Sequence, residues 1–497
     1  MAFVSVAILA TVCYAIYVAI YRLYLSPLAH FPGPKLAALT GWVEVWYDIV
    51  IGGQFTMQIE KWHKKYGPII RIKPNEVHIS DPDFYNELFT TTAAYQKPDD
   101  WRYRFGYGTA LFDTSDHVHH NQRRAPLATF FSRSKILSFS SVMQEHIDGL
   151  VNRLQNKYRG QVVCVNKAFD ALTMDLIGFY AFGLDYHSTE YPNFDAPYYA
   201  VTEDVARMVH VAGHFPWVVT ILQALPQKLL AFLSPPLKKT SKFQKEINSQ
   251  IHKIVNGQNH MNMEHSTIFH AILNSKLDPS ELTEKRLGHE AGSLVGAALE
   301  TSKMTASLAV YYVLAKPEIY KKLKEELNAA MPDPEKSLSV PELEQLPYLS
   351  AVIKEALRLS IGVSQRIRRY SDNQPIYYGK YVIPPGTVFG MCHWEQLRDP
   401  RIWDRPTEFL PDRWLGDEPK ALNGQPLAKY FVPFHRGTRM CLGKEMGMAQ
   451  LNMGLATLFR RLDLELFESG QDTVDIVADY FVPLVKEGSK GVRVLVK

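Results

Sequence analysis

Residues 434–443 read Phe-His-Arg-Gly-Thr-Arg-Met-Cys-Leu-Gly and place one cysteine, Cys441, in a loop flanked by glycines. Two arginines precede this cysteine, and residues 446–459 behind it have the apolar spacing of a helix. Positive charge and the backbone amides at the start of a helix both favour a thiolate. The stretch therefore predicts a nucleophilic or metal-ligating thiolate, although an isolated cysteine is also commonly a small buried apolar side chain.

Outside this loop, helical periodicity dominates the chain. The apolar spacing predicts helices over residues 141–158, 283–315, 317–331 and 346–359. The strand patterns are short and come in two pairs, 69–73 with 77–80 and 381–383 with 388–391, the second joined by the turn Pro384-Pro385-Gly386. We expect a mainly α fold with a minor β-sheet, and no internal repeat or long linker divides it.

The composition excludes two classes of protein. Of the 497 residues, 46% are hydrophobic and 21% are charged, so the chain is not intrinsically disordered. The 55 basic and 51 acidic residues give a net charge of +4 without a long basic run, so we expect no nucleic-acid partner. The four cysteines lack the spacing of a disulfide framework or a zinc knuckle, which indicates thiols in a reducing compartment.

The start of the chain predicts a transmembrane anchor over residues 2–21. This uncharged apolar run has the roughly 20 residues that are needed to cross a bilayer. No charge precedes the run and Arg22 follows it, which favours a retained anchor and a cytosolic body, with a signal peptide or an amphipathic segment as alternatives. Residues 22–36 contain Pro32-Gly33-Pro34 and predict a Pro-rich hinge before a body over 37–497.

The pattern Phe-x-x-Gly-x-Arg-x-Cys-x-Gly of residues 434–443 resembles the haem-binding loop of cytochromes P450 at every fixed position. Two upstream stretches are similar to further signatures of that family, in the family's order. Glu355-Ala356-Leu357-Arg358 resembles its Glu-x-x-Arg helix, and residues 409–414, Phe-Leu-Pro-Asp-Arg-Trp, resemble its Pro-Glu-Arg-Phe segment. The resemblance covers essentially the whole chain and implies a P450-type single-domain fold with an N-terminal transmembrane helix.

This resemblance implies haem b, iron protoporphyrin IX, as the cofactor and Cys441 as the axial ligand of its iron. A thiolate ligand pushes electron density onto iron and favours O–O cleavage. Phe434 and Gly443 belong to the same haem-binding loop, and we expect backbone amides near Gly443 to tune the thiolate by hydrogen bonding. Haem propionates need cations or donors, and the residues implied for them are Arg439, Arg369, His120 and Arg124.

His120 stands where the family usually has tryptophan, but an imidazole N–H can still donate to a propionate. The neighbouring His117, His119 and His120 also suggest a metal site. Against this interpretation, no carboxylate or cysteine completes a recognisable zinc spacing with them.

Glu355 and Arg358 are three residues apart, so they share a helix face and can pair. The resemblance implies that they form a buried structural cluster with Arg413 beside the haem. An ordinary exposed helix pair is the alternative, and such a pair contributes only a few tenths of a kcal/mol.

The helix predicted over 283–315 contains Gly296-Ala297-Ala298-Leu299-Glu300-Thr301-Ser302. Small residues at four-residue spacing are by themselves typical of close helix packing. The stretch is also similar to the family's oxygen-binding motif, with Ala298 where glycine is usual. The Thr301 hydroxyl can bond back to the Ala297 carbonyl and open the helix locally. The resemblance implies Thr301 and Glu300 as catalytic residues, with Glu300 as the proton-relay carboxylate.

The substrate pocket is expected, by position in the family, to be lined mainly by apolar side chains, which suits a hydrophobic molecule. The expected lining residues are Phe105, Gly296, Ala297, Val363 and Phe481, with ordinary core packing as the alternative for each. Several features, among them Glu300-Thr301-Ser302 and His120, resemble fungal enzymes of secondary metabolism near the trichodiene-oxygenase type.

We therefore expect a haem-thiolate monooxygenase that is anchored by a single span in the endoplasmic reticulum membrane, with its catalytic domain in the cytosol. It would hydroxylate or epoxidise a lipophilic terpenoid or polyketide-like molecule, using O2 and electrons from NADPH through NADPH-cytochrome P450 reductase. The basic residues expected to dock that reductase, with an ordinary solvated surface as the equal alternative, are Arg123, Arg133, Arg436 and Lys444. The alternatives are a P450-type isomerase, dehydratase or ring-forming oxidase, and a non-catalytic haem-binding protein.

Overall fold

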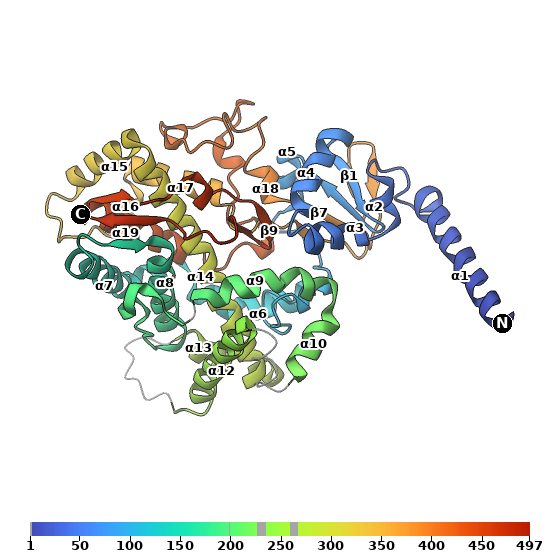
Figure 1. Cartoon of the computed structure of the whole chain (residues 1–497), viewed down its shortest axis with the longest axis horizontal. Coiled ribbons are helices and arrows are strands. Elements are labelled where there is room, and N and C mark those ends of the chain that lie inside the picture. The colour runs from blue at the N-terminus through green and yellow to red at the C-terminus, as the bar shows by residue number, and fades with distance from the viewer. Residues whose placement is uncertain (1, 198, 226–234, 259–266) are drawn as a thin grey trace.

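The computed structural model describes residues 2–197, 199–225, 235–258 and 267–497. Figure 1 shows a large helical body, a smaller lobe with a twisted sheet, and one N-terminal helix that projects away from both. This architecture confirms the prediction of a mainly helical fold with a minor sheet.

The helices are distributed along the whole described chain. Those of the first half are α1 (Ala2–Ile20), α2 (Lys35–Leu39), α3 (Trp42–Val45), α4 (Phe55–Tyr66), α5 (Pro82–Leu88), α6 (His117–Phe130), α7 (Arg133–Lys157), α8 (Val165–Phe182), α9 (Tyr199–His214) and α10 (Pro216–Ala224). Those of the second half are α12 (Pro235–Val255), α13 (Ile268–Leu273), α14 (Glu284–Ala315), α15 (Pro317–Ala330), α16 (Val340–Glu344), α17 (Pro347–Ser360), α18 (His393–Gln396) and α19 (Lys444–Arg461).

The helices predicted from apolar spacing are all present. α14, α15 and α17 agree with the predicted bounds to within one residue at each end. α7 starts at Arg133, well before the predicted residue 141, because its buried stripe already begins with Ile136 and Phe139. α19 is also slightly longer than the predicted 446–459.

The sheet of the smaller lobe joins two segments that are about 300 residues apart in the chain. It has the strand order β1 (Ile69–Lys73), β2 (Glu76–Ile79), β7 (Val388–Met391), β4 (Ile367–Arg369). β1 and β4 are antiparallel to their neighbours, whereas β2 and β7 are parallel, with Val77 opposite Phe389. Because both of these side chains are fully buried, the lobe cannot form from the N-terminal segment alone.

The remaining strands form small sheets: β3 (Val162–Cys164), β11 (Arg493–Val496) and β8 (Leu464–Leu466) in one, β5 (Ile376–Tyr378) with β6 (Tyr381–Ile383), and β9 (Ala478–Tyr480) with β10 (Val482–Leu484). The expected pairing of 381–383 with 388–391 is wrong. β6 is partly exposed and folds back on β5. β7, which follows the Pro-Pro-Gly turn, is buried throughout and lies in the centre of the larger sheet.

The long helix α14 crosses the helical body. The Thr283 side chain caps its first turn by accepting from the Arg286 backbone N–H. Leu287, Ala291, Val295 and Leu299 recur every four residues and are all fully buried, so they form one apolar stripe. α14 packs through its buried faces against α8, α12, α17 and α19. It is therefore held rigidly enough to present its polar residues at defined positions.

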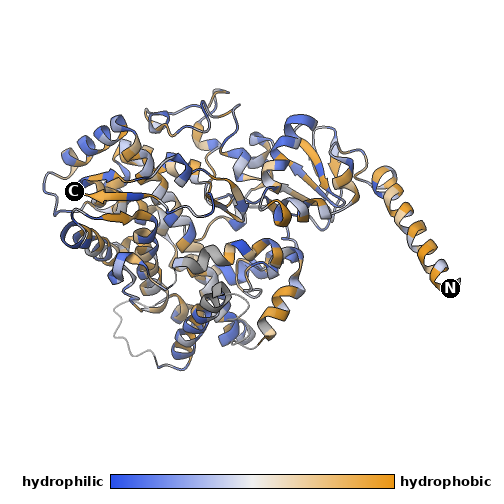
Figure 2. Cartoon of the chain, in the orientation of Figure 1, coloured by the Kyte–Doolittle hydropathy of each residue, from blue (hydrophilic) through white to orange (hydrophobic). Residues whose placement is uncertain are grey.

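The N-terminal helix α1 continues into a short π-helical turn, Tyr21–Leu25. Residues 3–25 are long and apolar enough to cross a membrane, and no part of their most apolar window is buried. Figure 2 shows α1 as an almost uniformly hydrophobic helix outside the body. Its length and composition fit the expected anchor.

The Pro-rich segment after α1 is docked on the smaller lobe. The Pro32 carbonyl accepts a 2.7 Å hydrogen bond from the backbone N–H of Arg71 in β1. Gly33 has a φ of +147°, and a Cβ at this position would lie 2.5 Å from the Arg71 carbonyl oxygen. Only glycine fits here, so the segment sets the direction in which α1 leaves the body.

Candidate active site

The loop before α19 holds Cys441 in a fixed position. The Cys441 backbone N–H donates to the Phe434 carbonyl at 2.9 Å and closes the loop. Gly437 has a φ of +77°, and a Cβ there would lie 2.6 Å from the Thr90 carbonyl oxygen. The backbone N–H groups of Gly443 and Lys444 donate to the Cys441 sulfur and oppose the rise in its pKa that burial causes. These are the amide contacts that we expected near Gly443.

Cys441 has an accessible side chain although protein surrounds it. Its side chain is exposed, yet desolvation by the surrounding protein raises the pKa of its thiol. Ala297 is likewise exposed in the middle of α14, where Val295 and Leu299 are fully buried. A Cβ added at Gly296 or Gly443 would meet no atom within 4 Å. Because α14 packs against α19, we infer from the exposure of Cys441 and Ala297 a ligand site between the Cys441 loop and the centre of α14, which we call the Cys441 hollow.

Four cationic side chains, Lys97, Arg124, Arg369 and Arg439, gather around this hollow, and none of them forms an ion pair with a carboxylate of the described residues. Burial and the nearby Arg369 and Arg124 lower the pKa of Arg439 to about 9. Burial lowers the pKa of Arg369 to about 10. Burial also holds the pKa of Lys97 well below its usual range, with Arg439 and Arg369 adding to the shift and Asp113 opposing it. Mutual repulsion of this kind destabilises a protein unless an anion joins the cluster.

The hydrogen bonds of these cations go mainly to backbone carbonyls. Arg439 donates to the carbonyls of Thr114 and Ser115, both at 2.7 Å, and its buried Nε has no partner among the described residues. Arg369 donates to the Arg368 carbonyl, and Lys97 to the Phe112 carbonyl. The arrangement fits a dianionic ligand such as the two propionates of haem.

Arg124 and His120 complete this cluster from α6. Arg124 lies close enough to Cys441 to lower the pKa of its thiol. His120 is buried, and desolvation together with Arg439 lowers its pKa to about 3, so its ring is a neutral donor. Lys97 was missed by the sequence analysis because no motif separates it from an ordinary turn lysine.

The histidines 117, 119 and 120 do not converge on one point. His119 Nε2 lies 2.8 Å from Glu281 Oε1, whereas the His117 ring contacts the Asn121 side chain. Within the described part of the chain, these three are not among the groups that could hold a metal ion.

Glu355, Arg358 and Arg413 form a buried ion cluster. Arg358 donates through Nε and Nη2 to the two carboxylate oxygens of Glu355, at 3.0 and 2.8 Å. Arg413 Nε donates to Glu355 Oε1 at 3.1 Å, and the Trp414 indole N–H donates to Oε2 at 2.9 Å. The remaining Arg358 donors go to the carbonyls of Leu397, Pro406 and Glu408. Each charge is therefore satisfied within the chain.

The polar residues of α14 point to two sides. The Thr301 hydroxyl donates to the Ala297 carbonyl at 2.9 Å, which is the bond that the four-residue spacing predicts. Glu300 instead forms a 2.7 Å ion pair with Lys303. Both line a second hollow with Tyr199 and the chain around Pro483. The sequence analysis did not identify Lys303 as the partner of Glu300.

Two expected pocket residues, Phe105 and Phe481, belong to an aromatic cluster. Their ring centroids are 4.9 Å apart, and both rings contact Phe112. The Trp101 ring contacts Phe112 and Phe481 from the other side. Val363, also expected in the pocket, is half-buried between α17 and β4.

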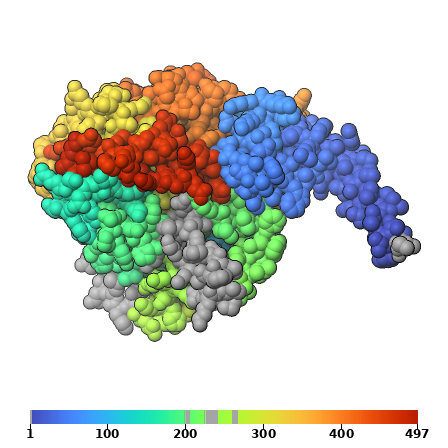
Figure 3. All heavy atoms as spheres, viewed as in Figure 1, coloured from blue at the N-terminus to red at the C-terminus, as the bar shows by residue number. Residues whose placement is uncertain are grey.

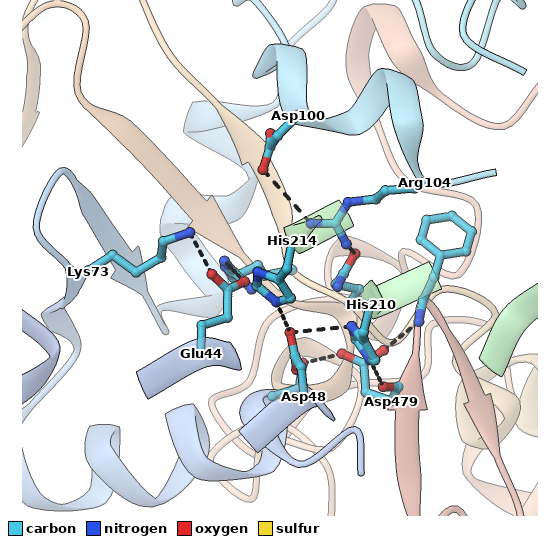
Figure 4. Close-up of polar contacts among 12 residues, drawn as sticks. Glu44, Asp48, Lys73, Asp100, Arg104, His210, His214 and Asp479 are labelled. Carbon is cyan, nitrogen blue, oxygen red and sulfur yellow. Dashed lines mark hydrogen bonds and ion pairs between the residues drawn. The ribbon is translucent and has the colours of Figure 1, made fainter. Parts of the chain in front are cut away.

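A buried polar network holds Phe481 at its unusual φ of +76°. The Asp479 carboxylate accepts from the backbone N–H of Phe481 at 2.9 Å and from the Ser364 hydroxyl at 2.7 Å. Figure 4 shows this network continuing to α9, where His210 Nε2 donates to the Asp479 carbonyl at 2.6 Å and His210 and His214 both approach Asp48. These contacts connect α9 to β9 and to Phe481, which belongs to the aromatic cluster.

The expected docking role of Arg123 is wrong. Arg123 is buried and donates to Glu281 at 2.7 Å, so it is not available to a partner protein. Arg133 is exposed but paired with Glu344 and Glu445. Lys444 lies 3.4 Å from Glu445, and Arg436 donates to the Ala428 carbonyl.

The sequence was compared with known families and proteins. A family model described as Cytochrome P450 matches residues 32–481. The chain is 70% identical over 494 residues to the cytochrome P450 monooxygenase orf6 of Eupenicillium brefeldianum, with 98% of each chain covered. It is 41% identical over 494 residues to the cytochrome P450 monooxygenase sdnE of Sordaria araneosa, covering 97% of this chain and 96% of that protein. It is 36% identical over 499 residues to the tryptophan 6-hydroxylase fscE of Fusarium equiseti, covering 99% and 97%.

Proposed function

Because the chain belongs to the cytochrome P450 family and is a P450 monooxygenase, we propose that it oxidises a lipophilic small molecule of secondary metabolism, of terpenoid or polyketide type. The observation that carries this proposal is the hollow between Cys441 and α14, with four unpaired cations at its edge and an aromatic cluster nearby. Haem b is the cofactor that this family implies.

Bound haem supplies the redox chemistry that activates O2, and the chain supplies the surroundings. Cys441 provides the thiolate ligand, and the amides of Gly443 and Lys444 moderate its basicity. Arg439, Arg369, Arg124 and Lys97, together with the neutral ring of His120, hold the propionates. Glu355, Arg358 and Arg413 would stabilise the packing of α17 beside α19 without contacting the reacting atoms.

Thr301 and Glu300 serve proton transfer in this proposal. The Thr301 hydroxyl, bonded to the Ala297 carbonyl, lies on the side of α14 where Ala297 faces the hollow. Glu300 sits one residue earlier and pairs with Lys303 beside the second hollow. The Glu300 carboxylate would therefore accept a proton from that side of α14 and pass it on, and the Thr301 hydroxyl would hold the last proton at its Oγ1.

The aromatic cluster of Phe105, Phe112, Trp101 and Phe481 favours an apolar substrate that is broad enough to contact several rings. The relative from Fusarium equiseti is named for hydroxylating tryptophan. Aromatic amino acids therefore belong in a substrate screen beside terpenoid and polyketide candidates.

Membrane attachment also fits the surface. Beside the base of α1, exposed apolar side chains lie on two segments that are far apart in sequence: Leu36, Trp42, Trp46, Val50 and Ile51 on one, Trp217 and Ile221 on the other. The rings of Trp42 and Phe215 lie 6.1 Å apart and connect the two. Figure 3 shows the N-terminal lobe in blue above green residues of α10, on the side from which α1 leaves. We propose that this side rests on the endoplasmic reticulum membrane, with the body in the cytosol.

The first test is spectroscopic. The reduced, carbon monoxide-bound protein should show the red-shifted Soret band of a thiolate ligand, and Cys441→His should lose this band. Turnover of a screened lipophilic substrate should require NADPH, a P450 reductase and O2. Turnover without NADPH and O2 would instead identify an isomerase or dehydratase and overturn the monooxygenase proposal for this site.

A second test addresses the proton path. Thr301→Ala should uncouple NADPH consumption from product formation, whereas Thr301→Ser, which keeps the hydroxyl, should remain close to the wild type. Unchanged coupling in Thr301→Ala would contradict the proposed role of this hydroxyl.

A further inference from the structure

Away from the Cys441 hollow, two histidines and a glutamate meet inside the smaller lobe. His63 comes from α4, His78 from β2 and Glu395 from α18. One potential ligand atom of each lies within 4.8 Å of the others. His63 Nε2 is 2.8 Å from His78 Nδ1, and the Glu395 carboxylate oxygens are 3.9 Å from His63 Nε2 and 3.6 Å from His78 Nδ1. All three side chains are at most 8% exposed.

The His63 ring is oriented by a backbone carbonyl. Its Nδ1 lies 2.8 Å from the Gly67 carbonyl oxygen. Because a carbonyl only accepts, this nitrogen carries the proton, and Nε2 presents its lone pair to the other two residues. Metal-binding histidines are commonly oriented in this way. His78 Nδ1 donates to the His63 lone pair, so binding an ion would require this proton to move to His78 Nε2, which has no partner among the described residues.

Glu395 lacks a partner that would justify its burial. Neither of its carboxylate oxygens has a hydrogen-bond partner of ordinary geometry among the described residues. The Ser80 hydroxyl and Arg401 lie close enough to favour the charged carboxylate, but neither forms an ion pair or a hydrogen bond of ordinary geometry with it. An unpartnered buried carboxyl group is costly, and a cation between the three residues would remove this cost.

We propose that His63 Nε2, His78 Nδ1 and Glu395 bind one divalent transition-metal ion, for which zinc is the best match. Two imidazoles and one carboxylate are an established zinc ligand set, and a water molecule would complete the tetrahedron. With Zn–N bonds of about 2.0–2.1 Å, the two nitrogens would separate to roughly 3.3 Å, a shift of a few tenths of an ångström from their present distance.

The ion would have a structural role. Its ligands come from α4, β2 and α18, and the last of these is more than 300 residues from the others along the chain. β2 and β7 already pair in parallel, and α18 follows β7 directly. The metal would therefore stabilise the contact between the segment that carries β2 and the segment that carries β7.

A second trio, Asp48, His210 and His214, offers a matched control. Here His210 Nδ1 lies 3.3 Å and His214 Nε2 3.1 Å from the same Asp48 oxygen (Figure 4). The Asp48 charge raises the pKa of His210, so that ring keeps the proton with which a metal would compete. This trio is neutralised by its own members, and we expect it to bind no zinc.

The decisive measurement is the metal content of the full-length, haem-replete protein, purified without a polyhistidine tag. Inductively coupled plasma mass spectrometry should find about one zinc per haem iron. The zinc K-edge spectrum should report nitrogen and oxygen ligands at about 2.0–2.2 Å and no sulfur. Iron-replete protein that takes up no zinc even after incubation with Zn²⁺, or zinc bound by sulfur, would overturn the proposal.

Variants then assign the ligands. Glu395→Gln and His63→Gln should each weaken zinc binding by at least about 100-fold while the carbon monoxide spectrum of the haem is kept. His214→Gln should keep the zinc-to-iron ratio of the wild type. Retention of zinc in both Glu395→Gln and His63→Gln, or its loss in His214→Gln alone, would contradict the assignment. If the two ligand variants fail to fold, the stoichiometry and the edge spectrum of the wild type decide.

Discussion

Arg358 and Arg369 are both buried guanidinium groups, and only Arg358 has a carboxylate partner. Arg358 uses all its nitrogens on Glu355 and three backbone carbonyls. Arg369 donates to one backbone carbonyl, and burial lowers its pKa to about 10. The cluster around Glu355 is complete within the chain, whereas the cluster around Cys441 needs an anion from outside. Unpaired buried charge thus marks the ligand site, and paired charge marks the scaffold beside it.

The largest effect is expected in the complete cluster. Arg358→Ala leaves the Glu355 carboxylate buried with only Arg413 and Trp414 as side-chain partners, which should destabilise the protein by about 3–5 kcal/mol. Denaturant unfolding and haem content by the pyridine haemochrome method would measure this loss. Lys321→Ala, which removes an exposed helix ion pair with Glu325, should change stability by no more than about 0.5 kcal/mol. Normal haem content in Arg358→Ala would break the distinction between the clusters.

Removal of haem should increase hydrogen exchange around Cys441 and leave it slow around Glu355. Because haem binds the folded chain, its extraction should cost about 4 kcal/mol of stability when its concentration is about 1,000 times its Kd. Hydrogen exchange should then accelerate in residues 434–443 and in the centre of α14 but stay slow in α17, where Glu355 and Arg358 lie. Equal acceleration in α17 would show that the Glu355 cluster also depends on the ligand.

Arg369→Gln should act on the ligand rather than on the scaffold. Loss of a charge-assisted hydrogen bond of about 1.5–3 kcal/mol weakens haem retention by roughly 10- to 150-fold, measured as haem transfer to apomyoglobin. The apoprotein should be at least as stable as the wild type, because an unpaired buried charge is gone. Arg369→Lys, which keeps the charge, should retain part of the affinity. A less stable apoprotein with unchanged haem retention would reverse the assignment of this arginine.

The smallest effect is expected from Trp414→Phe. This change removes one donor from Glu355 Oε2, which still accepts from Arg358 Nε, and should cost about 1.5 kcal/mol. Thermal unfolding of the haem-bound protein would detect the loss, while the carbon monoxide spectrum should not change. An altered spectrum would mean that the cluster contributes directly to the haem environment.

Much of the fold was predictable because its helices carry strong local signals. The buried stripe of α14, from Leu287 to Leu299, repeats every four residues and is legible without a structure. The pairing of β7 was not predictable, because a short apolar strand does not indicate its neighbour. β7 lies between β2, about 300 residues earlier, and β4, and not beside the adjacent β6. Only the packing of the whole lobe decides between these partners.

The candidate site shows the same division. Cys441, Arg439 and the pair of Glu355 with Arg358 stand in short motifs whose spacing already indicates their chemistry. Lys97, Lys303 and Asp479 have no such motif, and each acquires its importance from a residue or charge brought near by folding. Arg123 illustrates the opposite case, because it was expected to be an exposed docking residue, whereas in the structure it is buried and paired with Glu281.

The sequence by itself determined the family, the thiolate loop, the apolar anchor and the helical character of the body, since each depends on residues close together in the chain. The tertiary structure alone decided which buried charges are compensated. It pairs Arg358 with Glu355 and leaves Arg369 and Arg439 without an ion pair among the described residues, and it brings His63, His78 and Glu395 together. The physical reason is that Coulomb energy and desolvation depend on distance in space and on burial, which residue order does not specify.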